Sequence, residues 1–307
     1  MRVVFLGNDP WSVPSVEALA ASRHALALIV TREPRAAGRG GKLRPTAVAD
    51  AARRLGLPLR EVDTVKRGPG LEAIRAAEPE VLAVVAYGEI LPTEVLGLPS
   101  RAPVNMHFSL LPAYRGADPV RRTLLDGAGI TGVTTMRMDE GMDTGPVLLQ
   151  REEPVRDDDD AGSLGERLAA IGGDLLVETL DGLEDGTLAE REQDHAGATM
   201  APKLKPDDEW IDWTHDAPSL RRLIRALSPD PGARTRHRGK ILKVYRARVE
   251  EGTGEPGTIL AASQLGLVVA AGAGALLLEE VLPEGKRRMT GAEFVRGYRP
   301  EAGDALG

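Results

Sequence analysis

The chain has 307 residues and a formal net charge of −7, with 39 Lys and Arg against 46 Asp and Glu. Apolar residues make up 42% and charged residues 28%, a balance typical of folded globular proteins and not of disordered chains. The absence of cysteine excludes disulfides, thiol nucleophiles and iron–sulfur clusters. Because one domain usually has ~100–200 residues, we expect two domains.

The two stretches that could serve targeting or membrane insertion are both too short. Residues 1–7 predict a first strand, because this apolar run is shorter than the core of a signal peptide. Residues 265–278 fall short of the ~20 residues of a spanning helix and are interrupted by Gly272 and Gly274. We therefore expect a cytoplasmic protein that does not associate with membranes.

The first half of the chain alternates short apolar runs with amphipathic stretches, which is typical of an α/β fold with a parallel sheet and crossover helices. Strands are predicted over residues 3–6, 25–30, 81–86, 104–107 and 132–136. Helices are predicted over residues 13–21, 46–55, 71–77 and 119–125. A Rossmann-like sheet of this kind binds ligands at the carboxyl ends of its strands.

The second half changes character twice. An amphipathic helix over residues 163–183 starts with a capping-box pattern, Ser163 followed by Glu166. Residues 194–208 are polar and include Pro202 and Pro206, so they predict a linker between domains 1–193 and 209–307. A helix over 218–227 and strands over 241–249, 257–261, 266–271 and 275–281 then indicate a small OB-like β-barrel domain.

Positive charge gathers in two segments of this acidic chain. Residues 203–248 contain twelve Lys and Arg against six Asp and Glu, and residues 32–44 contain five against one. Local basic segments on an acidic protein indicate a polyanion bound at a defined place. For any single side chain, a solvated surface charge is the alternative.

The segment 105–116 carries the first candidate for catalysis. Asn105 and His107 are two residues apart at the end of a predicted strand, so their side chains share one face. A carboxamide and an imidazole can both donate hydrogen bonds to an oxygen that becomes negative during acyl transfer. Taken alone the pair is a weak signal, because a histidine near a strand end is more often structural.

An acidic, glycine-rich loop over residues 139–146 follows the next predicted strand. In a parallel sheet this loop would lie near Asn105, so that a carboxylate such as Asp143 could orient His107 or relay a proton. A calcium loop is the competing interpretation, but the spacing of its acidic residues does not fit one. A solvated turn is the other alternative.

Three motifs together resemble the folate-dependent formyltransferase family: Asn105-x-His107, the Ser-Leu-Leu-Pro-Ala-Tyr-Arg-Gly of residues 109–116, and the loop 139–146. The resemblance implies a formyltransferase domain in which Asn105 and His107 stabilise the tetrahedral oxyanion. Asp143 would position His107 and help to remove the proton of the attacking amine. These roles suit formyl transfer to an amine, which needs a neutral nucleophile, oxyanion stabilisation and proton removal.

The same resemblance implies 10-formyltetrahydrofolate as co-substrate, with no metal and no covalent intermediate. The pterin would be recognised largely by main-chain groups of two segments. The residues implied in folate binding are Tyr87, Gly88, Ile90, Leu91, Ser109, Leu110, Leu111, Pro112 and Asp139.

Within that family, residues 34–43 resemble the basic loop of the members that act on methionyl-tRNA. Residues 211–233, 283–289 and 293–294 resemble the C-terminal domain of the same members, so the resemblance spans essentially the whole chain. It implies initiator methionyl-tRNA as partner, a tRNA-binding C-terminal domain, and a monomer without an obligate protein partner. The implied tRNA contacts are Arg35, Arg39, Lys42, Arg44, Lys203 and Lys205.

Four residues depart from the family pattern, namely Asn8, Asp9, Asp118 and Asp230, and other functions share the motifs. A formyltransferase acting on a nucleotide-linked amino sugar or on glycinamide ribonucleotide would need the same three catalytic side chains, but not the basic segments. A hydrolase that releases formate from formyltetrahydrofolate would usually carry a different second domain. A non-catalytic RNA-binding protein would have no need of Asn105, His107 and Asp143.

Overall fold

The computed structural model describes residues 1–37 and 42–307, and the chain divides into two compact units. The first unit contains Met1–Pro119, Ile130–Pro154 and Gly165–Pro202. The second contains Lys203–Gly307 together with Val120–Gly129 and Val155–Leu164. Two short segments from the first two hundred residues thus group with the C-terminal unit, and the boundary at Lys203 falls inside the predicted linker.

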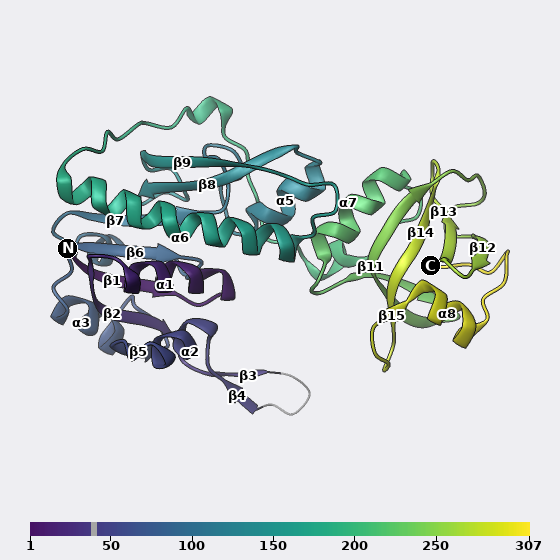
Figure 1. Cartoon of the computed structure of the whole chain (residues 1–307), viewed down its shortest axis with the longest axis horizontal. Helices are drawn as coiled ribbons and strands as arrows, with labels where there is room; N and C mark the ends of the chain where they lie inside the picture. The colour runs from purple at the N-terminus through teal and green to yellow at the C-terminus, as the bar shows by residue number, and fades with distance from the viewer. Residues whose placement is uncertain (38–41) are drawn as a thin grey trace. The chain divides into compact units, whose positions relative to one another are not determined.

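A seven-stranded sheet forms the centre of the first unit (Figure 1). Its order is β5-β2-β1-β6-β7-β8-β9, and the first five strands in this order are parallel. The bounds are β1 Arg2–Gly7, β2 Ala25–Arg32, β5 Leu59–Val62, β6 Val81–Val85, β7 Ala102–His107, β8 Ile130–Arg137 and β9 Val147–Pro154. The predicted Rossmann-like α/β sheet is confirmed, with β5 and β9 as strands that the pattern did not reveal.

Strand β6 shows why the sheet is covered on both faces. All five of its residues are apolar and buried, as expected for a central parallel strand between two layers of helices. The helices of this part are α1 Val13–Ala21, α2 Ala47–Arg54, α3 Gly68–Ala76, α4 Thr93–Leu96 and α6 Ala161–Asp185, with short helices η1 Pro10–Ser12 and η2 His195–Gly197. No helix among the described residues is long and apolar enough to cross a bilayer.

The start of α6 corrects the capping-box prediction at Ser163. The Asp160 Oδ1 atom accepts the N–H of Ser163 at 2.9 Å, and Ser163 Oγ accepts the N–H of Asp160 at 3.0 Å. Asp160 therefore caps the helix, which begins at Ala161, and Ser163 is the third helical residue instead of the cap.

A two-stranded hairpin extends away from the rest of the first unit (Figure 1). It consists of β3 (Arg35–Ala37) and β4 (Lys42–Arg44), which pair only with each other in the sheet pattern. Arg35 lies directly opposite Arg44. The hairpin therefore places two arginines side by side on an outlying part of the unit.

Strand β8 runs antiparallel to β7, which corrects the expectation that it continues the parallel sheet. His107 at the end of β7 pairs with Thr134, while Val104 near its start pairs with Arg137 at the end of β8. The connection through α5 (Pro119–Asp126) does not carry the chain back across the sheet, so β8 starts beside the end of β7. A parallel strand would require a crossover to the opposite edge.

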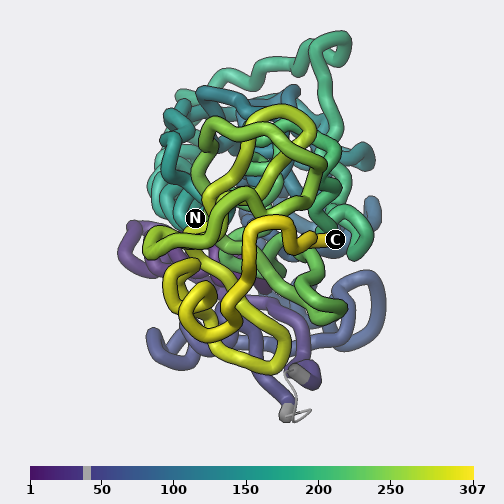
Figure 2. Tube along the Cα trace, turned by 90° about the vertical axis from the view of Figure 1, so that its right-hand side faces the viewer, coloured from purple at the N-terminus to yellow at the C-terminus, as the bar shows by residue number. Residues whose placement is uncertain are grey.

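An antiparallel sheet with the order β10-β11-β14-β13-β12, to which β15 adds by pairing with β14, forms the second unit. Its strands are β10 Ala233–His237, β11 Lys240–Glu250, β12 Ile259–Ser263, β13 Gly266–Ala270, β14 Ala275–Pro283 and β15 Met289–Thr290, and its helices are η3 Pro206–Glu209, α7 Ala217–Leu227 and α8 Gly291–Tyr298. The end of the chain lies on this unit (Figure 2), where the N–H of Leu306 donates to Gly257 O at 2.8 Å. The predicted small β domain is confirmed as an antiparallel-sheet unit.

A buried hydroxyl on β8 holds the loop that follows β7. Thr134 Oγ1 donates to Ser109 O at 2.6 Å, accepts the N–H of Leu111 at 3.1 Å and accepts Gln150 Nε2 at 3.0 Å. One donor and two acceptor positions are thus all used. Thr131, on the same strand, is also buried, but its hydroxyl has no partner in the described chain.

These two threonines make a matched pair for a stability test. We expect Thr134→Val to lower the free energy of unfolding by about 2–4 kcal/mol, because it leaves polar groups of the loop buried without partners. Thr131→Val should be neutral or stabilising, because it removes a hydroxyl that is already unsatisfied. Urea unfolding of both variants measures the difference, and equal losses would contradict the role given to Thr134.

Candidate active site

The carboxyl end of β7 places Asn105 and His107 on one face of the sheet. Asn105 lies between Val84 of β6 and Met136 of β8, so it occupies the middle of the sheet. Its side chain is half-buried and makes no hydrogen bond within the described residues. Its donors and acceptor are therefore open to a ligand.

His107 is held from both sides of its ring. Its side chain is 7% exposed; Nε2 lies 2.9 Å from the carbonyl oxygen of Tyr114, and Nδ1 lies 3.7 Å from Asp143 Oδ2. Because a carbonyl can only accept, Nε2 carries a hydrogen and donates it to Tyr114. Nδ1 is therefore the ring atom that remains for chemistry, and it faces a carboxylate.

Asp143 is fixed by the loop that follows β7. Its Oδ2 atom accepts the N–H of Gly116 at 2.8 Å. Gly116 has a φ of +121°, and a Cβ there would lie 2.9 Å from the carbonyl oxygen of Ala201, so only glycine fits. The structure thus brings all three predicted catalytic residues together, with the motif glycine as the connecting group.

The acidic loop reaches His107 by a route that parallel topology did not predict. Because β8 is antiparallel, the loop leaves the sheet beside the start of β7, at the end opposite to His107. Gln193 Nε2 binds the loop by donating to Asp143 O at 2.9 Å and to Gly145 O at 2.7 Å. Asp139, implied in folate binding, stabilises the loop itself: its Oδ1 accepts the N–H of Gly141 and the Thr144 hydroxyl.

The segment after β6 presents few groups to a ligand. The side chains of Tyr87 and Leu91 belong to the core of the first unit, whereas Gly88 is exposed and Ile90 is 70% exposed. Burial raises the pKa of the Tyr87 phenol, so it stays neutral. The carbonyl of Tyr87 accepts Asn8 Nδ2, and that of Gly88 accepts Arg32 Nη2 at 2.8 Å. Ile90 therefore offers the largest accessible apolar surface of this segment.

Most polar groups of residues 109–112 are used inside the protein. Ser109 Oγ donates to Ala113 O at 2.6 Å, Leu111 O accepts Gln150 Nε2 at 2.8 Å, and Pro112 O accepts the N–H of Thr199 at 3.3 Å. Leu110 is partly exposed, and its side chain lies against Gly132. These contacts hold the turn that delivers the carbonyl of Tyr114 and the N–H of Gly116.

The residues that depart from the family pattern have structural partners. Asn8 Oδ1 accepts the N–H of Arg32 at 2.8 Å and the Thr31 hydroxyl at 2.9 Å, which ties β1 to β2. Asp9 caps η1 by accepting the N–H of Trp11 at 3.0 Å. Asp118 is buried, and its own N–H donates to the carbonyl of Ala201. In the second unit, the carbonyl of Asp230 accepts Arg121 Nη2 at 2.9 Å.

The basic residues implied in tRNA binding lie in two places. Arg35 and Arg44 are exposed on the β3–β4 hairpin, Lys42 lies in β4, and Arg39 lies outside the described residues. Neither Arg35 nor Arg44 has an ion-pair partner in the part of the chain that the structure describes. Lys203 and Lys205 are exposed and, over the same residues, likewise without one.

A second group of titratable side chains lies elsewhere in the first unit. His24, Asp181 and Glu184 place their ligand atoms within 4.8 Å of one another, as a metal site would. Arg23 Nε, however, lies 2.5 Å from Asp181 Oδ1 and 3.2 Å from Glu184 Oε2. Burial lowers the pKa of His24, so its ring is neutral at neutral pH. Arg23 and the ammonium group of Met1, which lies 3.0 Å from Glu184 Oε1, therefore supply the positive charge that these carboxylates need.

Gln193 and Arg115 are contributors that the sequence did not reveal as parts of the site. Arg115 lies within the motif of residues 109–116, but the motif did not indicate a function for it. Gln193 stands at the boundary of the predicted first domain, outside any motif. Only the contact of Gln193 with the acidic loop, about fifty residues earlier in the chain, identifies it.

Solved structures share this fold. HypX from Aquifex aeolicus, in complex with tetrahydrofolic acid, matches with a TM-score of 0.65 at 20% identity over 100% of this chain and 50% of its own. The N-formyltransferase from Helicobacter canadensis, in complex with folinic acid and dTDP-3-aminofucose, matches with a TM-score of 0.69 at 15% identity over 94% of this chain and 100% of its own. At these identities the likeness shows the fold alone.

Relatives with much higher identity match from end to end. A protein of Geotalea daltonii is 40% identical over 307 residues, which cover 100% of this chain and 98% of that one. A protein of Moorella thermoacetica is 41% identical over 309 residues, which cover 100% of this chain and 99% of that one. Both are named methionyl-tRNA formyltransferase.

The two units correspond to two family models. The model described as formyl transferase matches residues 1–180, which is more than half of the chain. The model described as formyl transferase, C-terminal domain, matches residues 203–299. Together with the end-to-end relatives and the geometry at the end of β7, these matches place the chain in the formyl transferase family.

Proposed function

We propose that this chain transfers the formyl group of 10-formyltetrahydrofolate to the amino group of initiator methionyl-tRNA. The observation that carries the proposal is the arrangement of His107 between Tyr114 O and Asp143 Oδ2, beside an Asn105 carboxamide without a partner. The relatives that match over their full length carry the name of this activity. A chain that kept only RNA binding would have no use for this arrangement.

A folate co-substrate fits the position of the site. Parallel α/β sheets bind ligands beyond the carboxyl ends of their strands, where the strand order reverses, and here β1 lies between β2 and β6 at such a point. Asn105 and His107 end the neighbouring strand β7, and Ile90 provides exposed apolar surface after β6. Two structural neighbours were solved with tetrahydrofolic acid and folinic acid, which supports a reduced folate as the ligand class.

The geometry suggests how the residues divide the chemistry. The amine attacks the formyl carbon, and Asn105 Nδ2 donates to the oxygen that becomes negative. His107 can donate to the same oxygen only from a protonated Nδ1, because its Nε2 hydrogen is already given to Tyr114. Asp143 Oδ2 lies 3.7 Å from Nδ1, so it orients the ring.

Asp143 removes the proton of the attacking amine. Its Oδ2 atom is taken by Gly116, and no hydrogen bond within the described chain uses Oδ1. Oδ1 accepts the proton directly or through a water, while the bond between the formyl carbon and N10 breaks. The proton then passes to N10, so the products are the formylated amine and tetrahydrofolate. No step calls for a metal.

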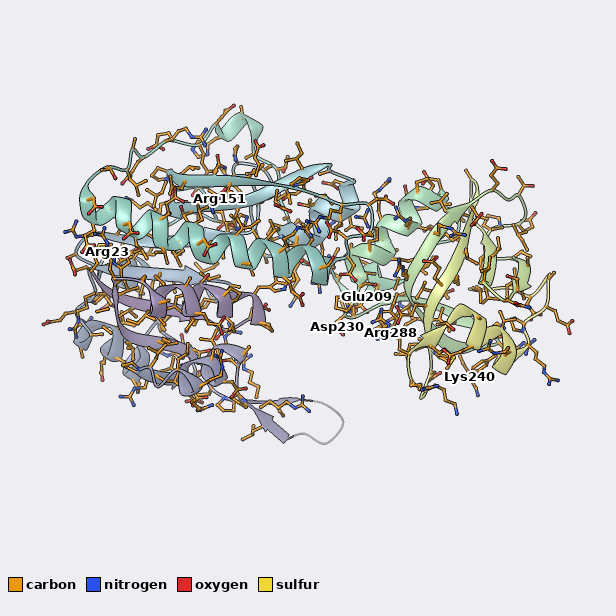
Figure 3. The ribbon with its side chains drawn as sticks, viewed as in Figure 1. Arg23, Arg151, Glu209, Asp230, Lys240 and Arg288 are labelled. Atoms are coloured by element: carbon orange, nitrogen blue, oxygen red, sulfur yellow. The ribbon has the colours of Figure 1, made fainter. Side chains whose placement is uncertain are left out.

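The basic side chains support tRNA as the carrier of the amine. Arg35 and Arg44 lie opposite each other on the hairpin, where two like charges repel unless an anion lies between or above them. On the second unit, Lys203, Lys205 and Lys240 are exposed, and the side chain of Lys240 is labelled in Figure 3. We therefore assign transfer to residues 1–193 and tRNA binding to the hairpin, the segment 194–208 and the C-terminal domain 209–307.

A kinetic test addresses the catalytic residues. With 10-formyltetrahydrofolate and methionyl-tRNA, His107→Ala should lower kcat on the order of 100–1000-fold, because one charged oxyanion donor is lost. Folate binding measured by fluorescence titration should persist, because residues 109–112 are held by Thr134, Gln150 and Thr199 and not by the imidazole. Formation of formylmethionyl-tRNA by the wild type is required. If folate binds but tRNA is not formylated, the amine carrier is another molecule, and amino-sugar nucleotides are the next to try.

A salt-dependence test addresses the hairpin. Removing both arginines in Arg35→Ala/Arg44→Ala should weaken tRNA binding on the order of tenfold and lower the slope of log Kd against log salt by ~2, since about one counterion is released per phosphate contact. Arg75→Ala is the control, because Arg75 is exposed on α3 and paired with Glu94 at 2.6 Å. The same loss in both proteins would contradict a contact made by the hairpin.

A further inference from the structure

A buried glutamine connects the acidic loop to the motif after β7. Gln193 is 6% exposed, and all four hydrogen-bonding positions of its carboxamide are used. Oε1 accepts Nε and Nη2 of Arg115 at 3.1 and 2.7 Å. Nε2 donates to the carbonyls of Asp143 and Gly145 at 2.9 and 2.7 Å. The carboxamide thus bridges a cation and two carbonyl oxygens.

Chemistry fixes the orientation of this carboxamide. Arg115 has only donors, so the atom that faces it must be the oxygen of Gln193. The two carbonyls have only acceptors, so the atom that faces them must be the NH₂ group. Arg115 is itself only 6% exposed, and no carboxylate lies within ion-pair distance of it among the described residues. A charged donor of this kind strengthens its hydrogen bonds and holds the carboxamide firmly.

The loop that Gln193 holds is tight. Asp143 has a φ of +54°, in the left-handed region that aspartate adopts at a cost. A Cβ at Gly145 would lie 1.9 Å from the carbonyl oxygen of Arg137, so the chain passes itself closely there. Two hydrogen bonds from one side chain to the carbonyls of Asp143 and Gly145 compensate this conformation.

Three consecutive residues then set the whole arrangement. The carbonyl of Tyr114 binds His107, the guanidinium of Arg115 binds Gln193, and the N–H of Gly116 binds the Asp143 carboxylate. Asp143 is thereby held at two points, its carboxylate from Gly116 and its main chain from Gln193. Both points are needed to aim a carboxylate, because one bond alone leaves rotation free.

We propose that Gln193 is a positioning residue for formyl transfer, which fixes the main chain of Asp143 so that its carboxylate faces Nδ1 of His107. This role rests on the proposed function, because it is a role in that reaction. Gln193 touches neither reactant. It acts through Asp143, and Arg115 acts through Gln193 by fixing which way the carboxamide faces.

Gln193→Glu tests the proposal with almost no change of shape. The carboxylate keeps its contact with Arg115 but faces the carbonyls of Asp143 and Gly145 with an oxygen in place of two N–H donors. We expect kcat to fall at least tenfold and the KM values for folate and methionyl-tRNA to stay within about threefold. The melting temperature should fall because two buried carbonyls lose their donors, so the kinetics are measured well below it. Hydrogen exchange of the peptide covering residues 138–147 should become faster.

Gln150→Glu is the matched comparison. Gln150 has the same chemistry, because its oxygen accepts Arg191 while Nε2 donates to Leu111 O at 2.8 Å and Thr134 Oγ1 at 3.0 Å. It does not touch the acidic loop. Because Gln150 holds Leu111 and Thr134 and not the acidic loop, we expect this variant to lower kcat through the loop after β7 but to leave the exchange of residues 138–147 unchanged.

Failure of the proposed function and failure of the positioning role give different results. A wild-type protein that does not formylate methionyl-tRNA overturns the proposed function, whereas the exchange measurement still reports whether Gln193 fixes the loop. Unchanged kcat or unchanged exchange in Gln193→Glu overturns the positioning role. Equally accelerated exchange in the Gln193 and Gln150 variants, or a kcat loss in Gln193→Glu that disappears well below its melting temperature, also overturns it, because Gln193 would then serve stability alone.

Discussion

The candidate site depends on one constraint: the loop that leaves β7 must satisfy its buried polar main chain without regular secondary structure. Three other segments meet this need, through Thr134 on β8, Gln150 on β9 and the main chain of Thr199. An unpaired buried N–H or carbonyl costs about 1–3 kcal/mol, so these contacts decide where the loop lies. The positions of Tyr114 and Gly116, and through them of His107 and Asp143, follow from that requirement.

The buried charges of the first unit are arranged so that Arg115 and Asp143 do not pair with each other. Arg115 is buried without a carboxylate and is bound by neutral acceptors, while Asp143 receives a main-chain N–H and faces the imidazole of His107. A buried ion pair between Arg115 and Asp143 would have satisfied both charges but removed the carboxylate from the reaction. Gln193 lies between them and holds the main chain of Asp143, and it neutralises neither charge.

The sequence predicted the elements whose patterns are local. Strand β6 is a run of five buried apolar residues, and α7 begins at Ala217 after its Asp216 cap, one residue from the prediction. The motif also identified Asn105, His107 and Asp143, which the structure brings together. The direction of β8 was not predictable in this way, because strand direction depends on where the connection ends and not on the strand's own residues. We therefore expected Asp143 to lie near His107 on the wrong assumption that β8 runs parallel to β7.

What the sequence could not give were the long-range partners. Gln193, Thr134 and Gln150 belong to types that are usually exposed or capping, and no spacing marks them, since their partners lie 16 to 78 residues away. Thr131 and Thr134 stand on the same strand with similar burial, yet only one of them has partners. Such roles are set by the packed fold, so a pattern read along the chain cannot separate them.

The carboxamide of Asn105, which has no partner in the described chain, links the geometry of the site to the proposed function. Around it, most polar groups of the loop, the carboxamide of Gln193 and Asp143 Oδ2 are engaged, whereas the Asn105 carboxamide has no partner among the residues that the structure describes. The side chain is half-buried and its polar atoms are open to solvent, so a ligand oxygen that accepts its N–H replaces a water. If the charge on that oxygen grows during the reaction, the hydrogen bond strengthens in the transition state and lowers the barrier instead of merely tightening binding.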